Sequence, residues 1–216
     1  MKVDCHVHTA YSSTKLWKRD GFGKPEEIVK LASRSGLGGI AITDHHEIKG
    51  ARAAEKKGRR AGIVVIPGVE IRTEKGDVLA LNVTEIPKGS TAEEVCENVK
   101  EMGGLTVAAH PFSSSPLRKG GAHLVAEAVE VLNSWSSKGD NRKAESFAGA
   151  SGKPFTAGSD AHFPELVGSA GIICSGETPD EILEEIRKRR VRVFGKELPI
   201  LKKAVLSIRK VAGQFA

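Results

Sequence analysis

The chain is poor in cysteine, aromatic residues and long apolar runs. Its three cysteines are widely spaced and form no Cys-x-x-Cys pair, which argues against a zinc knuckle or a redox motif. No stretch approaches the roughly 20 apolar residues that cross a bilayer, and the charged start of the chain lacks the apolar run of a signal peptide. We therefore expect a cytoplasmic protein with reduced thiols and no membrane contact.

The sequence also lacks internal boundaries. No Ser/Gly/Pro-rich linker, low-complexity tract or repeat of fixed period interrupts it. A length of 216 residues suits one domain with a substantial core, and 39% hydrophobic with 28% charged residues is ordinary for a folded soluble protein. We predict a single domain over residues 1–216, in which the informative motifs lie within 1–176 and residues 177–216 form a C-terminal extension.

Positive charge is in excess. The net charge of +6 and the isoelectric point near 9.2 favour anionic partners, but they do not separate a small phosphorylated molecule from a nucleic acid. Much of the charge lies in two runs, 56–60 and 187–190. Such runs are typical of solvated helix faces, so nucleic acid is the less favoured partner. The oligomeric state is not indicated.

Short β-branched runs alternate with helical patterns, which predicts an α/β fold with a mainly parallel sheet. Pro25 and Gly36 bound one predicted helix, while Thr91 and Thr178 each begin a capping-box pattern. The predicted helices begin at or just after residues 26, 91 and 178, and the segment 113–121 is predicted to be a mobile loop. The predicted strands cover residues 2–6, 39–43, 63–71, 78–83, 105–109, 128–132, 154–157 and 191–194.

Unusual polar residues fall at the ends of these strands. Because the carboxyl ends of parallel strands meet on one face, residues far apart in sequence are expected to converge there. Five of the seven histidines occupy such positions, whereas His46 and His123 do not. The strand-end residues are His6, His8, Asp44, His45, Glu70, His110, Asn133, Asp160 and His162.

Imidazole and carboxylate without thiolate are the ligands expected for catalytic zinc, manganese or iron. Residues two apart in a strand share a face, so His6 and His8 can reach one ion, as can Asp160 and His162 if their segment is extended. Glu70 is placed to bridge two ions. A lone histidine after a strand is more often a loop residue, and only the whole constellation favours a metal site. We interpret Asp4, Asp44 and Ser159 as supporting or turn residues, and Cys5 as buried packing.

Five motifs resemble, in order, those of the PHP (polymerase and histidinol phosphatase) family. They are Asp4-Cys5-His6-Val7-His8-Thr9, Thr43-Asp44-His45, Gly68-Val69-Glu70-Ile71, Ala109-His110-Pro111 and Gly158-Ser159-Asp160-Ala161-His162. The resemblance runs from Met1 to about Gly176. It implies a distorted (β/α)7 barrel that holds two to three divalent ions, manganese, zinc or iron.

The resemblance also implies a ligand set. His6, His8, Glu70 and Asp160 would hold one ion, and Glu70 would bridge to a second ion held also by His110. His45 and His162 would belong to a third. The sequence departs from the family pattern in two places. No acid or histidine lies at 11–14, Asp20 being the nearest acid, so the third ion stays open; and Asp77 stands where members carry a histidine, as a substitute ligand.

The resemblance and the ligands together predict hydrolysis of a small phosphomonoester, nucleotide-like or histidinol-phosphate-like, through attack by a metal-bound hydroxide. Glu70, His110 and His162 are the predicted catalytic residues, and either histidine could donate the proton to the leaving group. Arg72, Lys18 and Arg19 are predicted to bind substrate, although a surface salt bridge is an equal alternative for each.

Two alternatives remain open. The first is a non-catalytic barrel that serves as a scaffold or RNA-binding subunit, which the positive charge would suit. The second is an exonuclease that acts on short single strands, for which stacking aromatics are needed. The aromatic residues in predicted loops near the site are Tyr11, Trp17, Phe22, Phe112 and Trp135.

Overall fold

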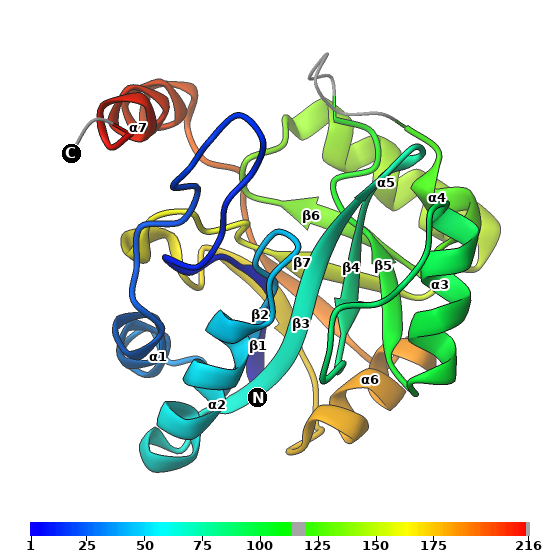
Figure 1. Ribbon diagram of the computed structural model, residues 1–216. Helices are drawn as coiled ribbons and strands as arrows, with labels where there is room; N and C mark the ends of the chain where they lie inside the picture. The colour runs from blue at the N-terminus through cyan, green and yellow to red at the C-terminus, as the bar shows by residue number, and fades with distance from the viewer. Residues whose placement is uncertain (114–119, 215–216) are drawn as a thin grey trace.

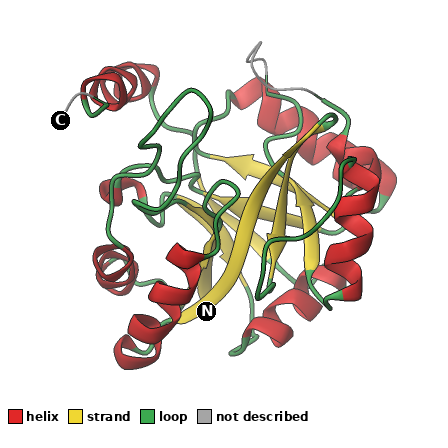
Figure 2. Ribbon diagram, viewed as in Figure 1, coloured by secondary structure: helices red, strands yellow, loops and turns green. Residues whose placement is uncertain are grey.

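The computed structural model describes residues 1–113 and 120–214, and it forms a curved central sheet with helices on the outside (Figures 1 and 2). The first half of the chain contains β1 (Lys2–Val7), α1 (Pro25–Arg34), β2 (Gly39–Ile42), α2 (Lys49–Ala61), β3 (Val64–Thr73), β4 (Gly76–Leu81), α3 (Ala92–Glu101) and β5 (Leu105–Ala108). The second half contains α4 (Ala122–Val125), β6 (Ala128–Asn133), α5 (Lys138–Ser151), β7 (Phe155–Gly158), the 3-10 turn η1 (Pro164–Leu166), β8 (Ala170–Ile173), α6 (Pro179–Arg187), β9 (Arg192–Gly195) and α7 (Ile200–Ala212).

The strands form one sheet in the order β7-β6-β5-β4-β3-β2-β1-β8-β9. The edge strand β7 curves back to β1, since a parallel bridge joins Val7, at the end of β1, to Ala161, which follows β7. The sheet is therefore a nearly closed barrel, and the predicted α/β barrel class is confirmed.

The expectation of a mainly parallel sheet is wrong in detail, because four of the eight strand pairings are antiparallel. Strand β4 runs antiparallel to both β3 and β5. A tight turn between Thr73 and Gly76 joins β3 to β4, so β4 begins two residues before the predicted strand start. As a result the start of β4, with Asp77, lies beside the carboxyl end of β3.

The helix boundaries follow the predicted end signals. Thr178 and Glu181 form a reciprocal capping box at α6. Thr91 accepts the Glu94 backbone N–H at α3, but the Glu94 carboxylate takes the N–H of Ser90. The basic run 56–60 lies in α2, where the four cationic side chains are exposed and Gly58 faces the core, as expected of a solvated helix face.

No residue range was predicted from the sequence for strand β8 or for the helices α2, α4, α5 and α7. Strand β8 has only four residues and gains its pairing from β1 and β9, so its local pattern is weak. Cys5 packs in a buried apolar cluster, as expected. Most of the predicted loop 113–121 lies outside the described residues. No helix in the described ranges is long and apolar enough to cross a membrane.

Candidate metal centre

The polar strand-end side chains converge at one end of the barrel. His8 follows β1, His45 follows β2, Glu70 lies in β3, and His110 follows β5. Asp160 and His162 follow β7, which the near-closure of the barrel brings beside β1. All these side chains are almost fully buried. Three groups of three or four side chains have the mutual spacing needed to hold an ion, namely His6/His8/Asp160, His6/Glu70/His110 and His8/Asp20/His45/His162.

The first group has close to the geometry of a tetrahedral ligand shell once Glu70 is included. The Nε2 atoms of His6 and His8 lie 3.1 Å apart. They lie 3.3 and 3.2 Å from Oε2 of Glu70, and 3.5 and 3.3 Å from Oδ1 of Asp160. A tetrahedron with metal–ligand bonds of about 2.0 to 2.1 Å has edges of about 3.3 to 3.4 Å. These four atoms therefore fit one ion.

The His6 ring is oriented by a carboxylate that was not predicted from the sequence. Its Nδ1 lies 3.1 Å from Oε1 of Glu130, an acid in the middle of β6. Because a carboxylate accepts hydrogen bonds, Nδ1 carries the proton and Nε2 is left as a lone-pair donor that faces Glu70 and His8. Burial opposes protonation of His6, but Asp160, Glu130 and Glu70 overcome it and raise its pKa well above the usual value. The site thus favours a positive charge at this position.

Glu70 is the centre of the cluster. Its Oε2 lies within 3.3 Å of ring nitrogens from His6, His8 and His45, and its Oε1 lies 3.2 Å from Nε2 of His110. Burial raises the pKa of this carboxyl, but His45 and His6 hold the pKa well below the usual value. With its two oxygens directed to different sets of imidazoles, Glu70 has the arrangement expected of a bridging ligand.

Asp77 lies at the edge of the second group. Its Oδ2 is 4.0 Å from Nε2 of His110, and its Oδ1 accepts a 3.0 Å hydrogen bond from Nε of Arg72. Among the described residues Asp77 belongs to none of the three groups with ligand spacing. Its predicted role as a ligand stays a prediction.

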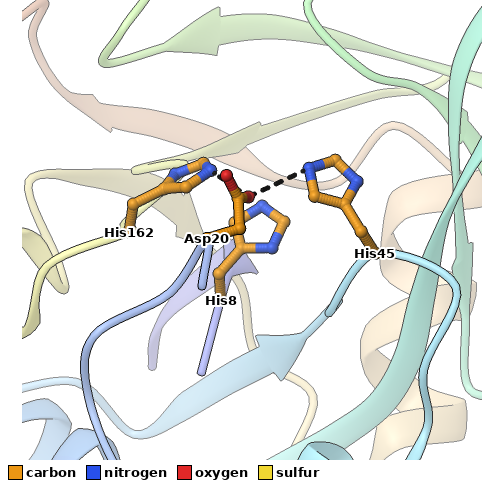
Figure 3. Close-up of side chains that lie close together, drawn as sticks. All are labelled: His8, Asp20, His45 and His162. Atoms are coloured by element: carbon orange, nitrogen blue, oxygen red, sulfur yellow. Dashed lines mark ion pairs between the residues drawn. The ribbon is translucent and has the colours of Figure 1, made fainter. Parts of the chain in front are cut away.

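The third group is completed by Asp20, which reaches the site from the loop between β1 and α1 (Figure 3). Its Oδ2 lies 2.9 Å from Nε2 of His162 and 3.3 Å from Nε2 of His45. The sequence identified Asp20 only as the nearest acid after the gap at 11–14. The loop folds back toward the barrel, so Asp20, six residues after the segment 11–14, supplies the carboxylate that this segment lacks.

The His162 ring is oriented by the backbone carbonyl group of Asp160. Its Nδ1 lies 2.9 Å from the carbonyl oxygen of Asp160, so Nδ1 carries the proton and Nε2 is a lone-pair donor. Burial lowers the pKa of His162 to about 4, so the ring is neutral near pH 7. An imidazole lone pair and a carboxylate oxygen then face each other at 2.9 Å, an arrangement that a bound cation would stabilise.

The segment that carries Asp160 is not extended. Asp160 has a φ of 52° and His110 a φ of 32°, both in the left-handed region that non-glycine residues rarely adopt. The condition under which Asp160 and His162 were expected to reach one ion, an extended segment, is therefore not met. Asp160 faces His6 and His8, whereas Nε2 of His162 faces Asp20.

The carboxylates of Asp4 and Asp44 accept hydrogen bonds from neighbouring loop residues rather than from imidazole rings. Asp4 accepts the backbone N–H groups of Ser159 and Gly168 at 2.9 and 2.8 Å, and Asp44 accepts the N–H and O–H of Thr9 at 2.6 and 2.7 Å. The expectation that these acids fix imidazole tautomers is wrong, since Glu130 takes that part at His6. Their role as turn residues agrees with the prediction.

The remaining predicted residues lie farther out. Arg72 lines a cavity of about 340 Å³ at the metal centre, together with Trp17 and Trp135. Lys18 is exposed, and the Arg19 guanidinium stacks on the Phe22 ring at 5.0 Å; neither lines this cavity. Nε2 of His46 accepts the N–H of Arg72, and His123 packs on the Phe112 and Phe147 rings, so neither belongs to the three groups with ligand spacing.

Comparison with family models matches residues 4–132 to the PHP domain and residues 138–191 to a PHP-associated segment. The chain belongs to the PHP domain family. The five motifs and the site described above fall within these ranges.

Individual relatives agree. An uncharacterized protein of Methanocaldococcus jannaschii is 39% identical over 146 residues, which are 64% of this chain and 85% of that protein. A phosphoribosyl 1,2-cyclic phosphate 1,2-diphosphodiesterase of Eggerthella lenta is 32% identical over 91 residues, 39% of this chain but only 32% of the enzyme. A two-domain protein of Bacteroides vulgatus, containing a predicted PHP-like metal-dependent phosphoesterase, superposes with a TM-score of 0.73 at 19% identity. The superposition covers 92% of this chain and 65% of that one, and it shows the common fold.

Proposed function

We propose that this PHP-family chain is a metal-dependent hydrolase of a small phosphomonoester, either nucleotide-like or histidinol-phosphate-like. The observation that carries the proposal is the cluster of four ligand atoms from His6, His8, Glu70 and Asp160, with separations of 3.1 to 3.5 Å among the measured pairs. A purely structural polar core would not require two imidazoles and two carboxylates to converge at one buried point.

The donor set suits two to three ions of manganese, zinc or iron, since every donor is an imidazole nitrogen or a carboxylate oxygen. We assign His6, His8, Glu70 and Asp160 to the first ion. Glu70 and His110 would hold the second, with Asp77 beside them. The third would lie among Asp20, His45 and His162, with the His8 ring beside them.

When bound, such ions lower the pKa of a coordinated water and neutralise charge on a phosphoryl group. The protein's own side chains would hold the ions and contact the substrate. Glu70 would keep neighbouring ions at a fixed spacing, and Glu130 would hold His6 in the tautomer that binds metal. Arg72, oriented by Asp77, would contact the substrate from the cavity wall.

His110 and His162 were both candidates for the proton donor. In the structure Nε2 of each ring faces a carboxylate, Glu70 for His110 and Asp20 for His162. This arrangement favours ligand roles for both rings, so the proton for the leaving group is better supplied by water than by either histidine.

The cavity supports a small substrate. A volume of about 340 Å³ suits a molecule of mononucleotide size rather than a long strand. The relative named as a phosphodiesterase and the structural neighbour that contains a predicted metal-dependent phosphoesterase support the same chemistry. The complete ligand groups argue against a non-catalytic scaffold, which would need no convergent ligands.

The test is metal content by plasma mass spectrometry, combined with phosphate release under added manganese. Substrates would be nucleoside monophosphates, histidinol phosphate, a cyclic phosphodiester and short oligonucleotides. We expect two to three ions per chain and turnover of one monoester class, lost in Glu70→Gln. The matched control is Glu26→Gln, which removes an exposed carboxylate from α1. Protein that stays inactive on every substrate after manganese loading, yet binds RNA, would replace the hydrolase with the scaffold.

A further inference from the structure

Helix α7 reaches the metal centre from outside the residues that define the family. It spans Ile200–Ala212, beyond both matched ranges, 4–132 and 138–191. Even so, Ser207 and Lys210 of α7 line the same cavity as His45, Asp160 and His162. Figure 1 shows the helix, in red, beside the blue loop that follows β1. The chain therefore adds a wall to the site that the family motifs do not provide.

Polar contacts, more than apolar burial, set the position of α7. Leu206 is its one buried residue, while Leu201 and Ile208 are 77% and 69% exposed. Nζ of Lys203 donates to the carbonyl oxygen of Ser136 at 2.8 Å. Just past the helix, Gln214 accepts the N–H of Arg19 at 3.2 Å and donates to its carbonyl at 2.6 Å. The Gln214 contacts hold the end of the helix against the loop that carries Asp20, and the Lys203 contact holds it against the segment after β6.

This position of α7 brings the Lys210 side chain to the wall of the cavity. Its ammonium group pairs with Oδ1 of Asp20 and lies 5.8 Å from the centroid of the Trp17 ring. The other oxygen of Asp20 faces His45 and His162. The Asp20 carboxylate thus lies between the Lys210 ammonium group and the rings of His45 and His162. The Lys210 side chain is 18% exposed, so it is largely desolvated but open to the cavity.

The cavity contains two cations among its described lining residues, Arg72 and Lys210. The Arg72 fork is already engaged, with Nε and Nη2 lying 3.0 and 3.4 Å from the two oxygens of Asp77. An ammonium group has three N–H donors, and the bond to Asp20 uses one of them. Lysine binds phosphate as a point charge and does not need a planar arrangement of acceptors. Both cations therefore keep N–H donors for an anionic ligand, three on Arg72 and two on Lys210, and Lys210 is the one that lies beside Asp20 of the third ligand group.

We infer that Lys210 is a substrate-binding residue, whose ammonium group contacts a non-bridging phosphate oxygen of the substrate while Asp20 and Trp17 hold it in place. The inference rests on the proposed function of the same site. It adds that recognition of the anion depends on helix α7, which lies outside the residues that the family models match. A purely structural role, in which Lys210 only compensates the charge of Asp20, makes a different prediction.

The experiment compares Lys210→Met with Lys202→Met in manganese-loaded protein. Lys202 lies exposed on the same helix, so its replacement removes the same charge without touching the cavity. Inorganic phosphate binding would be measured by calorimetry, metal content by mass spectrometry, and KM and kcat on the substrate found above. Loss of a hydrogen bond to a charged group corresponds to roughly 10- to 100-fold in affinity. We expect the phosphate Kd and KM to rise by about that factor in Lys210→Met, with metal content unchanged and kcat changed less.

Equal phosphate affinity in the two variants overturns the inference, and so does absence of phosphate binding to the wild-type protein. Loss of an ion with phosphate affinity kept assigns Lys210 to charge compensation instead. If Lys210→Met does not fold, Lys210→Gln, which keeps a polar contact to Asp20, replaces it with the same expected weakening. Wild-type protein that binds phosphate but hydrolyses no phosphoester rejects the proposed function, while the phosphate titration still decides the role of Lys210.

Discussion

Nδ1 of His6 lies 3.1 Å from Oε1 of Glu130, and this pair links the metal centre to the interior of the barrel. The other oxygen of Glu130 accepts the backbone N–H of His110 at 2.9 Å. One buried acid on β6 thus orients a ligand from β1 and the backbone of a ligand after β5.

Replacing Glu130 with glutamine is expected to weaken metal binding by about 10- to 100-fold, because the neutral amide no longer fixes the His6 tautomer. Competition with a chromogenic chelator measures the affinity. Glu145→Gln, an exposed change on α5, is the matched control. Equal affinities in the two variants would show that Glu130 serves only the backbone of His110.

Removal of the ions is expected to destabilise the fold, because the free energy of ion binding is lost and the buried carboxylates and imidazoles are then left to compensate one another's charge alone. At a free ion concentration a thousand times Kd, binding contributes about 4 kcal/mol per site. For a chain of this size that corresponds to a fall of roughly 8 to 16 °C in Tm for each site emptied by chelation. Scanning calorimetry before and after chelation, and again after manganese is restored, measures the change. An unaltered Tm would contradict a metal centre built into the core.

Asp20→Asn is expected to lower the metal content by one ion per chain and to leave the remaining ions in place. The reason is that Asp20 belongs to the group with His8, His45 and His162 and to neither of the others. Mass spectrometry of the dialysed variant measures the ratio, with Asp180→Asn as an exposed control at α6. Full occupancy in Asp20→Asn, or loss of all ions, would each refute an independent third site.

Gly158→Ala is expected to lower both stability and metal affinity. A Cβ at this position would contact the His6 side chain and lie 2.8 Å from the His6 backbone nitrogen, so the ligand must shift. Overpacking of this kind costs about 1 to 3 kcal/mol. Gly149→Ala is the control, since nothing lies within 4 Å of its added Cβ and α5 should gain about 0.5 to 1 kcal/mol. Denaturant unfolding and metal titration of both variants measure the contrast. Normal ion affinity in Gly158→Ala would mean that His6 tolerates displacement.

Local pattern was enough to identify most strands and several members of the three groups with ligand spacing. The His6 and His8 pair, Glu70 and His110 stand next to short β-branched runs, and parallel strands bring such positions to one face. Glu130 was missed although a signal existed, since a charged residue inside the strand Ala128–Asn133 must be paired if it is buried. Its partner His6 is 124 residues away, so the pairing itself leaves no local trace.

The sequence by itself determined the α/β class, the family and the chemical type of the donors, because period, strand-end position and residue type are local properties. Only the tertiary structure decided that Asp20 completes the third group, that Glu130 orients His6, and that Lys210 borders the site. Each of these contacts joins residues that are far apart in the sequence. No local pattern specifies the path of the loop or helix that brings them together. The left-handed turn at Asp160 likewise arises because the surrounding contacts, and not residue preference, hold it there.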